Sequence, residues 1–99
     1  MSQSNYAVLV RLKTELDRSE IERIMRERAP EFRALEGLEQ KYYHKGSEAG
    51  EYGGFYLWRS LDDVAEYRES DLAATIAAAY QGVGEPSVEV FKVVMPLRD

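Results

Sequence analysis

Two strand-like segments with large apolar side chains on both faces constrain the fold of this chain more than any other feature. Residues 38–45 (LEQKYYHK) and 52–59 (YGGFYLWR) are extended and aromatic, and a glycine-bounded turn joins them as a hairpin. Alternation along a strand sends Tyr56 and Trp58 to one face and Phe55 to the other. A sheet with two apolar faces needs a cover on each side.

The remaining segments complete a βαββαβ order. Residues 6–12 (YAVLVRL) and 87–95 (SVEVFKVVM) are rich in β-branched and apolar side chains, which predicts two further strands. Residues 19–35 carry an apolar stripe at helical spacing, and a helix over 61–69 is followed by a short helical segment that begins at Ser70. We therefore predict an α+β, ferredoxin-like fold: a four-stranded antiparallel sheet with its helices on one face.

Helix-capping and breaking residues mark where the predicted helices begin and end. Gly37 is expected to end the first helix in the left-handed conformation. Pro30 lies inside that helix, where its missing N–H and its ring predict a kink or a break. The predicted N-terminal caps are Ser19, paired with Glu22, and Ser60, paired with Asp63.

Composition narrows the classes of protein and partner. Ninety-nine residues without a linker-like stretch predict a single domain over 1–99. A net charge of -5 with interspersed acids and bases offers no basic stripe for nucleic acid. The absence of cysteine excludes disulfides and thiolate metal sites, and no apolar run approaches a membrane span or a signal peptide. We expect a cytoplasmic protein without nucleic-acid or membrane partners.

The second apolar sheet face predicts a homodimer. A chain of this length buries only about two thirds of the surface that it exposes when unfolded, so association would add useful burial. Because the helices are expected to cover one face only, a second copy is the natural cover for the other.

Three short motifs between residues 37 and 67 resemble the YdhR-like monooxygenase family of the dimeric α/β-barrel superfamily. The motifs of that family are G-[apolar]-x-x-K-x-[WY], G-G-x-Y-x-[WF] and A-x-x-Y. This chain resembles the family in having all three motifs in the same order. Gln40 and Arg68 depart from the pattern, since relatives carry an aromatic and an apolar residue there. The matching residues are Gly37, Leu38, Lys41 and Tyr43, then Gly53, Gly54, Tyr56 and Trp58, then Val64 or Ala65 with Tyr67.

The resemblance implies a dimeric α/β barrel with a pocket between sheet and helices in each subunit. It also implies cofactor-independent monooxygenation of a small planar aromatic or polyketide-like substrate, with neither a cofactor nor a metal. In such chemistry the ionised substrate itself gives an electron to oxygen. The protein then supplies a base, an apolar cage and donors for the oxyanion.

Seven residues are candidates for this chemistry. His44 is the one side chain whose unperturbed pKa lies near neutrality, which makes it the first candidate for a base, although a solvated histidine at a strand end near a turn is the stronger interpretation. Arg28 interrupts the helical apolar stripe, where snorkelling or pairing is favoured over ligand contact. Phe32 and Tyr80 are interpreted as packing residues. The candidate catalytic residues are His44 and Tyr56, and the candidate substrate-binding residues are Arg28, Lys41, Tyr43, Trp58 and Tyr67.

Each of these candidates also has a structural explanation. Lys41 would blunt an exposed strand edge, and the aromatics would be core or dimer interface. Two other functions therefore stay open: a ligand-binding dimer without catalysis, and a structural dimer whose pocket is too small for a ten-atom ligand. Haem degradation is disfavoured because the sole histidine lies on a predicted strand rather than on a helix.

Overall fold

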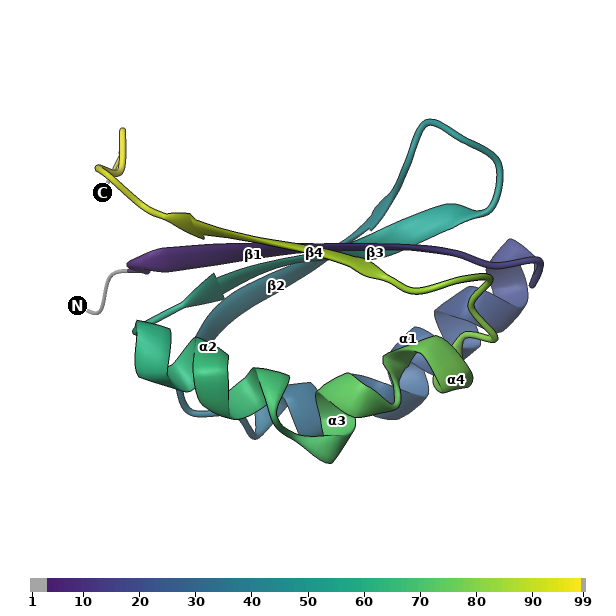
Figure 1. Cartoon of the computed structure of the whole chain (residues 1–99), viewed down its shortest axis with the longest axis horizontal. Helices are drawn as coiled ribbons and strands as arrows, with labels where there is room; N and C mark the ends of the chain where they lie inside the picture. The colour runs from purple at the N-terminus through teal and green to yellow at the C-terminus, as the bar shows by residue number, and fades with distance from the viewer. Residues whose placement is uncertain (1–3, 99) are drawn as a thin grey trace.

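The computed structural model describes residues 4–98 and confirms the ferredoxin-like α+β fold. One four-stranded sheet has the strand order β2-β3-β1-β4, and all three pairings are antiparallel. All helices lie on the same side of that sheet (Figure 1). In chain order the elements are β1 (Tyr6–Lys13), α1 (Arg18–Arg33), β2 (Leu38–Lys45), β3 (Glu51–Trp58), α2 (Leu61–Arg68), α3 (Asp71–Ala74), α4 (Ile76–Ala79) and β4 (Ser87–Lys92).

The helix-covered face of the sheet holds the core. Tyr56 on β3 lies between Val8 on β1 and Lys41 on β2, so these three side chains share that face. Tyr56 and Val8 are almost fully buried beneath the helices, and Trp58 is only 1% exposed. The core cluster consists of Val8, Val10, Leu12, Ile21, Ile24, Phe32, Tyr52, Tyr56, Trp58, Val64, Tyr67, Ile76 and Tyr80.

The other sheet face has no cover among residues 4–98. Phe55 on β3 lies there between Leu9 and Tyr42, and Phe91 on β4 lies on the same side. Tyr42 is 58% exposed and Phe91 45% exposed. We call the large apolar side chains of this face (Leu9, Tyr42, Phe55, Leu57 and Phe91) the open-face cluster.

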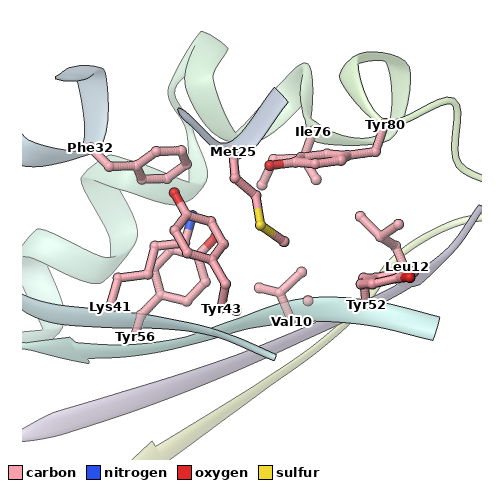
Figure 2. Close-up of a pocket in the computed structure, with 12 residues that line it drawn as sticks. Val10, Leu12, Met25, Phe32, Lys41, Tyr43, Tyr52, Tyr56, Ile76 and Tyr80 are labelled. Atoms are coloured by element: carbon pink, nitrogen blue, oxygen red, sulfur yellow. The ribbon is translucent and has the colours of Figure 1, made fainter. Parts of the chain in front are cut away.

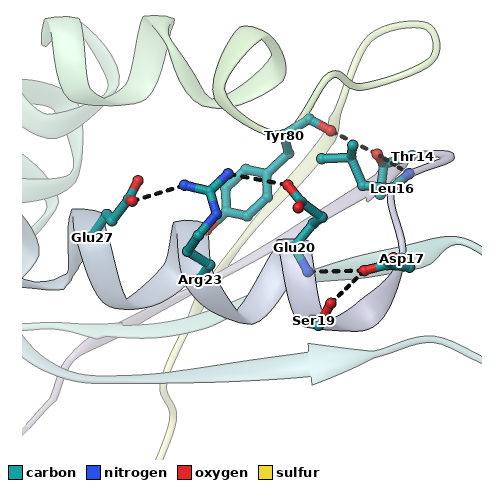
Figure 3. A network of polar contacts seen from close by, with 8 residues as sticks. All are labelled: Thr14, Leu16, Asp17, Ser19, Glu20, Arg23, Glu27 and Tyr80. Atoms are coloured by element: carbon teal, nitrogen blue, oxygen red, sulfur yellow. Dashed lines mark hydrogen bonds and ion pairs between the residues drawn. The ribbon is translucent and has the colours of Figure 1, made fainter.

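The cap of α1 differs from the prediction. Asp17, not Ser19, is the N-cap, and its carboxylate accepts a hydrogen bond of 3.0 Å from the Glu20 backbone N–H (Figure 3). The Ser19 hydroxyl instead donates to Asp17 at 2.7 Å. Both residue types cap helices well, and the aspartate two positions earlier takes the role. Of the kink or break expected near Arg26 to Ala29, the break is wrong, because α1 continues through Pro30 to Arg33, and the kink stays a prediction.

The second helical region follows the prediction more closely. Ser60 caps α2 by accepting from the Asp63 N–H, and Ser70 caps α3 by accepting from the Ala73 N–H. Strand β4 ends at Lys92, earlier than predicted, because its neighbour β1 begins at the opposite residue, Tyr6. None of the helices within residues 4–98 is long and apolar enough to cross a membrane.

Gly37 serves packing rather than helix termination. Its backbone is not left-handed, since among the described glycines only Gly50 and Gly84 have positive φ, and α1 ends at the right-handed Ala34. A Cβ on Gly37 would overlap the side chain of Asp63. The glycine therefore lets the first turn of α2 lie close to the segment that enters β2.

Candidate functional site

An enclosed apolar cavity lies between the helices and the covered face of the sheet. Phe32 and Met25 extend from α1 above it, and Tyr56, Tyr43 and Lys41 rise from the sheet below (Figure 2). The cavity is small, at about 20 Å³, which is room for about one water molecule. It is lined by Val10, Leu12, Met25, Phe32, Lys41, Tyr43, Tyr52, Gly53, Gly54, Tyr56, Ile76 and Tyr80.

A larger surface groove runs beside this cavity, between α1 and β2. It has a volume of about 350 Å³, which falls in the range of small-molecule sites. Phe32, Lys41 and Tyr43 line both the groove and the cavity, so these three side chains form the wall between them. We call the larger space the α1–β2 groove; its other lining residues are Ala29, Arg33, Leu38, Glu39 and Gln40.

The Lys41 amino group in this wall is surrounded by aromatic rings. Its Nζ lies 3.3 Å from the centre of the Phe32 ring and 4.5 Å from the ring centres of both Tyr43 and Tyr56. Burial, and secondly the positive charge of Arg28, lower the pKa of Lys41 from 10.5 to about 7. Near neutral pH, the amine is therefore divided between its charged and uncharged forms.

Gly53 and Gly54 make room for side chains on the two faces. A Cβ on Gly54 would lie 2.8 Å from a ring carbon of Tyr56 and 3.0 Å from Cε of Lys41. A Cβ on Gly53 would overlap the Val10 carbonyl oxygen. Neighbouring groups therefore approach both glycines closely, and the β1–β3 register passes through them without a shift.

Two buried tyrosine hydroxyls meet behind the cavity. The Oη atoms of Tyr56 and Tyr67 lie 3.3 Å apart, so one hydroxyl donates to the other. Burial is the main cause that raises the pKa of each phenol, so both stay protonated across the neutral range. Tyr56 can therefore act as a hydrogen-bond donor at this site but not as a base.

Trp58 and Tyr67 pack behind the cavity rather than lining it. The Trp58 ring stacks on Tyr56 with a centroid distance of 6.2 Å and an interplanar angle of 6°, and its centroid lies 5.2 Å from that of Tyr67. Trp58 Nε1 is buried without a hydrogen-bond partner among the described residues. Both side chains border a separate surface groove beside the start of α2.

Arg28 joins two helices. Its Nη2 donates to the Leu72 carbonyl oxygen at 2.7 Å, and both Nη atoms lie 3.3 Å from Thr75 Oγ1. These contacts tie α1 to the C-terminal end of α3, where unpaired carbonyl groups attract a cation. Arg28 therefore makes polar contacts with other helices, and its guanidinium does not line the cavity or the groove. Its effect on the site is electrostatic, because its positive charge contributes to the lowered pKa of Lys41.

His44 lies on the sheet face opposite Tyr56. Strand alternation places it beside the open-face cluster, and its Nε2 lies 3.2 Å from the Val10 carbonyl oxygen. The structure therefore does not bring the two predicted catalytic residues together within one chain. The departures Gln40 and Arg68 both lie outside the enclosed cavity, Gln40 in the α1–β2 groove and Arg68 beside β4.

Phe32, Met25 and Tyr80 are site residues that the sequence analysis left as packing or did not single out. Phe32 and Met25 are seven positions apart on the apolar stripe of α1, a spacing that places both on one helix face. The sequence signal that could have identified them is this apolar stripe, because a helix that covers the sheet must place it opposite the lysine and tyrosines of the hairpin. Residues 4–98 contain no group of three or more His, Cys, Asp or Glu side chains placed to hold a metal ion.

Solved structures with the same fold include several oxygenases. A protein of unknown function from Nitrosomonas europaea matches with a TM-score of 0.77 and 15% identity, over 97% of this chain and 95% of that one. A protein titled a putative antibiotic biosynthesis monooxygenase from Caulobacter crescentus matches with a TM-score of 0.75 and 21% identity, over 94% and 92%. SnoaB, a cofactor-independent oxygenase from Streptomyces nogalater, matches with a TM-score of 0.75 and 13% identity, over 98% and 100%.

Identities this low establish the shared fold alone. No curated protein matches the chain. Residues 8–98 match the family model described as "Putative mono-oxygenase ydhR". Because that match spans most of the sequence, the chain belongs to the ydhR mono-oxygenase family.

Proposed function

We propose that this protein is a cofactor-independent monooxygenase that binds a small planar aromatic or polyketide-like substrate in the α1–β2 groove. The observation that carries the proposal is the wall of Phe32, Lys41 and Tyr43, which lines a groove of about 350 Å³ with two aromatic side chains and one lysine. Aromatic faces suit a planar ligand, and the polar tips can orient it.

The volumes of the two spaces support placing the substrate in the groove rather than in the cavity. The enclosed cavity, at about 20 Å³, is too small for a ring system, whereas the α1–β2 groove can take one. The substrate ring therefore packs against Phe32 and Tyr43 from the groove side. The cavity behind that wall leaves space for a molecule no larger than water or dioxygen.

The proposed reaction consumes one dioxygen for each activated methylene. Loss of a proton leaves a carbanion or enolate, which gives one electron to oxygen. The two radicals combine to a peroxide, and loss of water leaves a carbonyl, so one oxygen atom enters the substrate and the other becomes water. An apolar wall around the oxyanion strengthens its interaction with the few polar groups present.

Oxygen uptake across a panel of phenols, quinols and anthrones tests this function. We expect turnover with at least one planar member, and a loss of about a hundredfold on Tyr56→Phe if the buried hydroxyl steadies the developing oxyanion. Tyr42→Phe is the matched control, because Tyr42 is a neighbouring tyrosine on the open face. No uptake with any member, or equal rates for both variants, would contradict the proposal.

Ligand binding without catalysis is the second candidate, favoured by the packing around the enclosed cavity. Such a protein would bind a planar metabolite in the α1–β2 groove and return it unchanged. Tight binding of a panel member, measured by calorimetry, with no oxygen consumed would establish this function in place of the first.

We also propose that the working unit is a homodimer formed through the open face. Three aromatic rings, those of Tyr42, Phe55 and Phe91, share that face with 36% or more of their surface exposed. The side chains of Val94 and Met95, which follow β4, are 96% and 76% exposed. Exposed apolar area of this kind is typical of protein interfaces. Sedimentation at low micromolar concentration should give twice the 11.4 kDa chain mass, and a species of 11.4 kDa alone would refute the dimer.

A further inference from the structure

The position of the Lys41 amino group differs from that of an ordinary strand lysine. A lysine on an edge strand normally lays its stem on apolar surface and directs its amino group to water. Lys45, four residues further along β2 on the same face, is exposed and lies 5.7 Å from its nearest ring centre, that of Tyr52. Lys41 instead places its Nζ 3.3 Å from the centre of the Phe32 ring, among three rings.

Within residues 4–98, no carboxylate forms an ion pair with Lys41 that would keep its amine charged. Burial and the positive charge of Arg28 act together to disfavour the ammonium form. The other titratable groups that line the cavity or the groove are Tyr43 and Glu39 of β2, Arg33 of α1, Tyr52 and Tyr56 of β3, and Tyr80 at the end of α4.

We propose that Lys41 is the catalytic base, and that it takes the proton of a weakly acidic phenol or enol bound in the α1–β2 groove. The O–H bond of the ligand breaks, an N–H bond forms at Nζ, and the electron pair stays on the ligand oxygen. The products are an oxyanion and an ammonium ion side by side. This assignment rests on the proposed function for its substrate class, and it gives Lys41 the role that the sequence offered to His44.

The aromatic rings favour the product of that transfer. An uncharged amine gains little from a ring face, whereas an ammonium ion is attracted to it by the ring quadrupole. The cage is therefore already arranged for the charge that appears when the proton arrives. The new ammonium lies beside the ligand oxyanion, so the charge that forms at Nζ is paired with an opposite charge as it appears. The substrate class follows: a planar ligand acidic enough to give its proton to an amine.

Binding of 4-nitrophenol tests the proton transfer without turnover, because only its phenolate absorbs strongly in the visible range. At a pH below the probe's own pKa, the wild-type protein should raise the phenolate absorbance, which amounts to a drop of about one unit in the pKa of the bound probe, or about tenfold in its ionisation. Lys41→Met should abolish the rise, and Lys45→Met, the matched control on the same strand face, should retain it.

The Lys41→Arg variant distinguishes two roles of Lys41: a base that takes up the proton, and a fixed positive charge that only attracts the phenolate. Arginine keeps a cation in the wall but cannot take up the proton, so the phenolate that it binds should release one proton to the buffer, as a pH indicator would report. Near pH 7 the wild-type protein should release less, by the fraction of Lys41 that is uncharged before the probe binds. Equal proton release by both proteins, or no absorbance rise with wild type, would overturn the proposal.

The wild-type chain alone provides a second measurement that no folding defect can affect. Carbon-detected NMR of labelled lysine should show the Lys41 Cε titrating near pH 7. A Lys41 signal that instead titrates near the ordinary lysine value of 10.5 would contradict the assignment. Oxygen uptake distinguishes the two proposals: unchanged uptake in Lys41→Met would refute the base alone, and proton transfer without uptake would refute the monooxygenase alone.

Discussion

The two faces of the sheet are built from the same strands and differ in almost every physical property. On the covered face, Val8, Tyr56 and Lys41 form a cross-strand row beneath the helices, and Tyr56 and Lys41 of this row line the enclosed cavity. On the open face, the equivalent row one residue along leaves Tyr42 58% exposed. Strand alternation thus places one set of side chains in the buried core and the other set on an exposed sheet face.

This comparison teaches how a small domain can hold both a site and an interface. The covered face draws its rigidity from helices of the same chain, so it can keep an amine among three rings. The open face lacks such support within residues 4–98, and we propose that a second copy covers it. The two proposals thus assign proton chemistry to the covered face and association to the open one.

The largest effect expected is on the covered face, from Trp58→Ala. This side chain is 1% exposed, and removing it should lower the free energy of unfolding by about 3–5 kcal/mol. Phe55→Ala on the open face should cost far less within one subunit, because the ring is 36% exposed. Urea unfolding at two protein concentrations measures both changes.

The concentration dependence sharpens the comparison. The effect of Trp58→Ala should be the same at both concentrations, whereas that of Phe55→Ala should grow with concentration as the dimer forms. A concentration-independent loss of several kcal/mol for Phe55→Ala would break the distinction between the faces.

The fold followed from periodicity, because strands and helices with one buried face repeat at different intervals. The hairpin, the position of α1 and the caps at Ser60 and Ser70 could all be read from the sequence. The first cap could not, since Asp17 and Ser19 are both good N-caps and only the path of the chain chooses between them.

The site was harder to predict because it depends on which sheet face the helices cover. Strand alternation divides the aromatic side chains between the two sheet faces, but it does not indicate which face lines the cavity. Lys41 illustrates the difficulty: β2 is an edge strand, as expected for a lysine that blunts an edge, yet its side chain lies under Phe32. The lysine and the phenylalanine are brought together by tertiary packing between α1 and β2, which no local pattern encodes.

The second expected effect concerns pH and tests whether the covered face holds a neutral amine. The pKa of Lys41 falls from 10.5 to about 7 on folding, so between these values the unfolded chain binds more protons than the folded one. Stability conferred by this residue therefore rises with pH across that window, by up to about 1.4 kcal/mol per pH unit. Between pH 7 and 9 wild type should gain about 2–3 kcal/mol relative to Lys41→Met.

Measurements should stop near pH 9, because burial raises the pKa of Tyr80 to about 12, and buried tyrosines of this kind reduce stability once the unfolded phenols ionise. Lys45→Met is the control and should track wild type at every pH. Parallel pH profiles for wild type and Lys41→Met would mean that the amine is charged in the folded protein throughout.

The smallest effect is expected from His44→Ala on the open face. The contact of its Nε2 with the Val10 carbonyl, at 3.2 Å, is worth about 1 kcal/mol or less to stability. Because the sheet separates His44 from the α1–β2 groove, the variant should leave 4-nitrophenol ionisation unchanged while Lys41→Met abolishes it. A loss of ionisation in His44→Ala at unchanged stability would show that an open-face histidine, from this subunit or a second copy, takes part in proton transfer, and the division between the two faces would no longer hold.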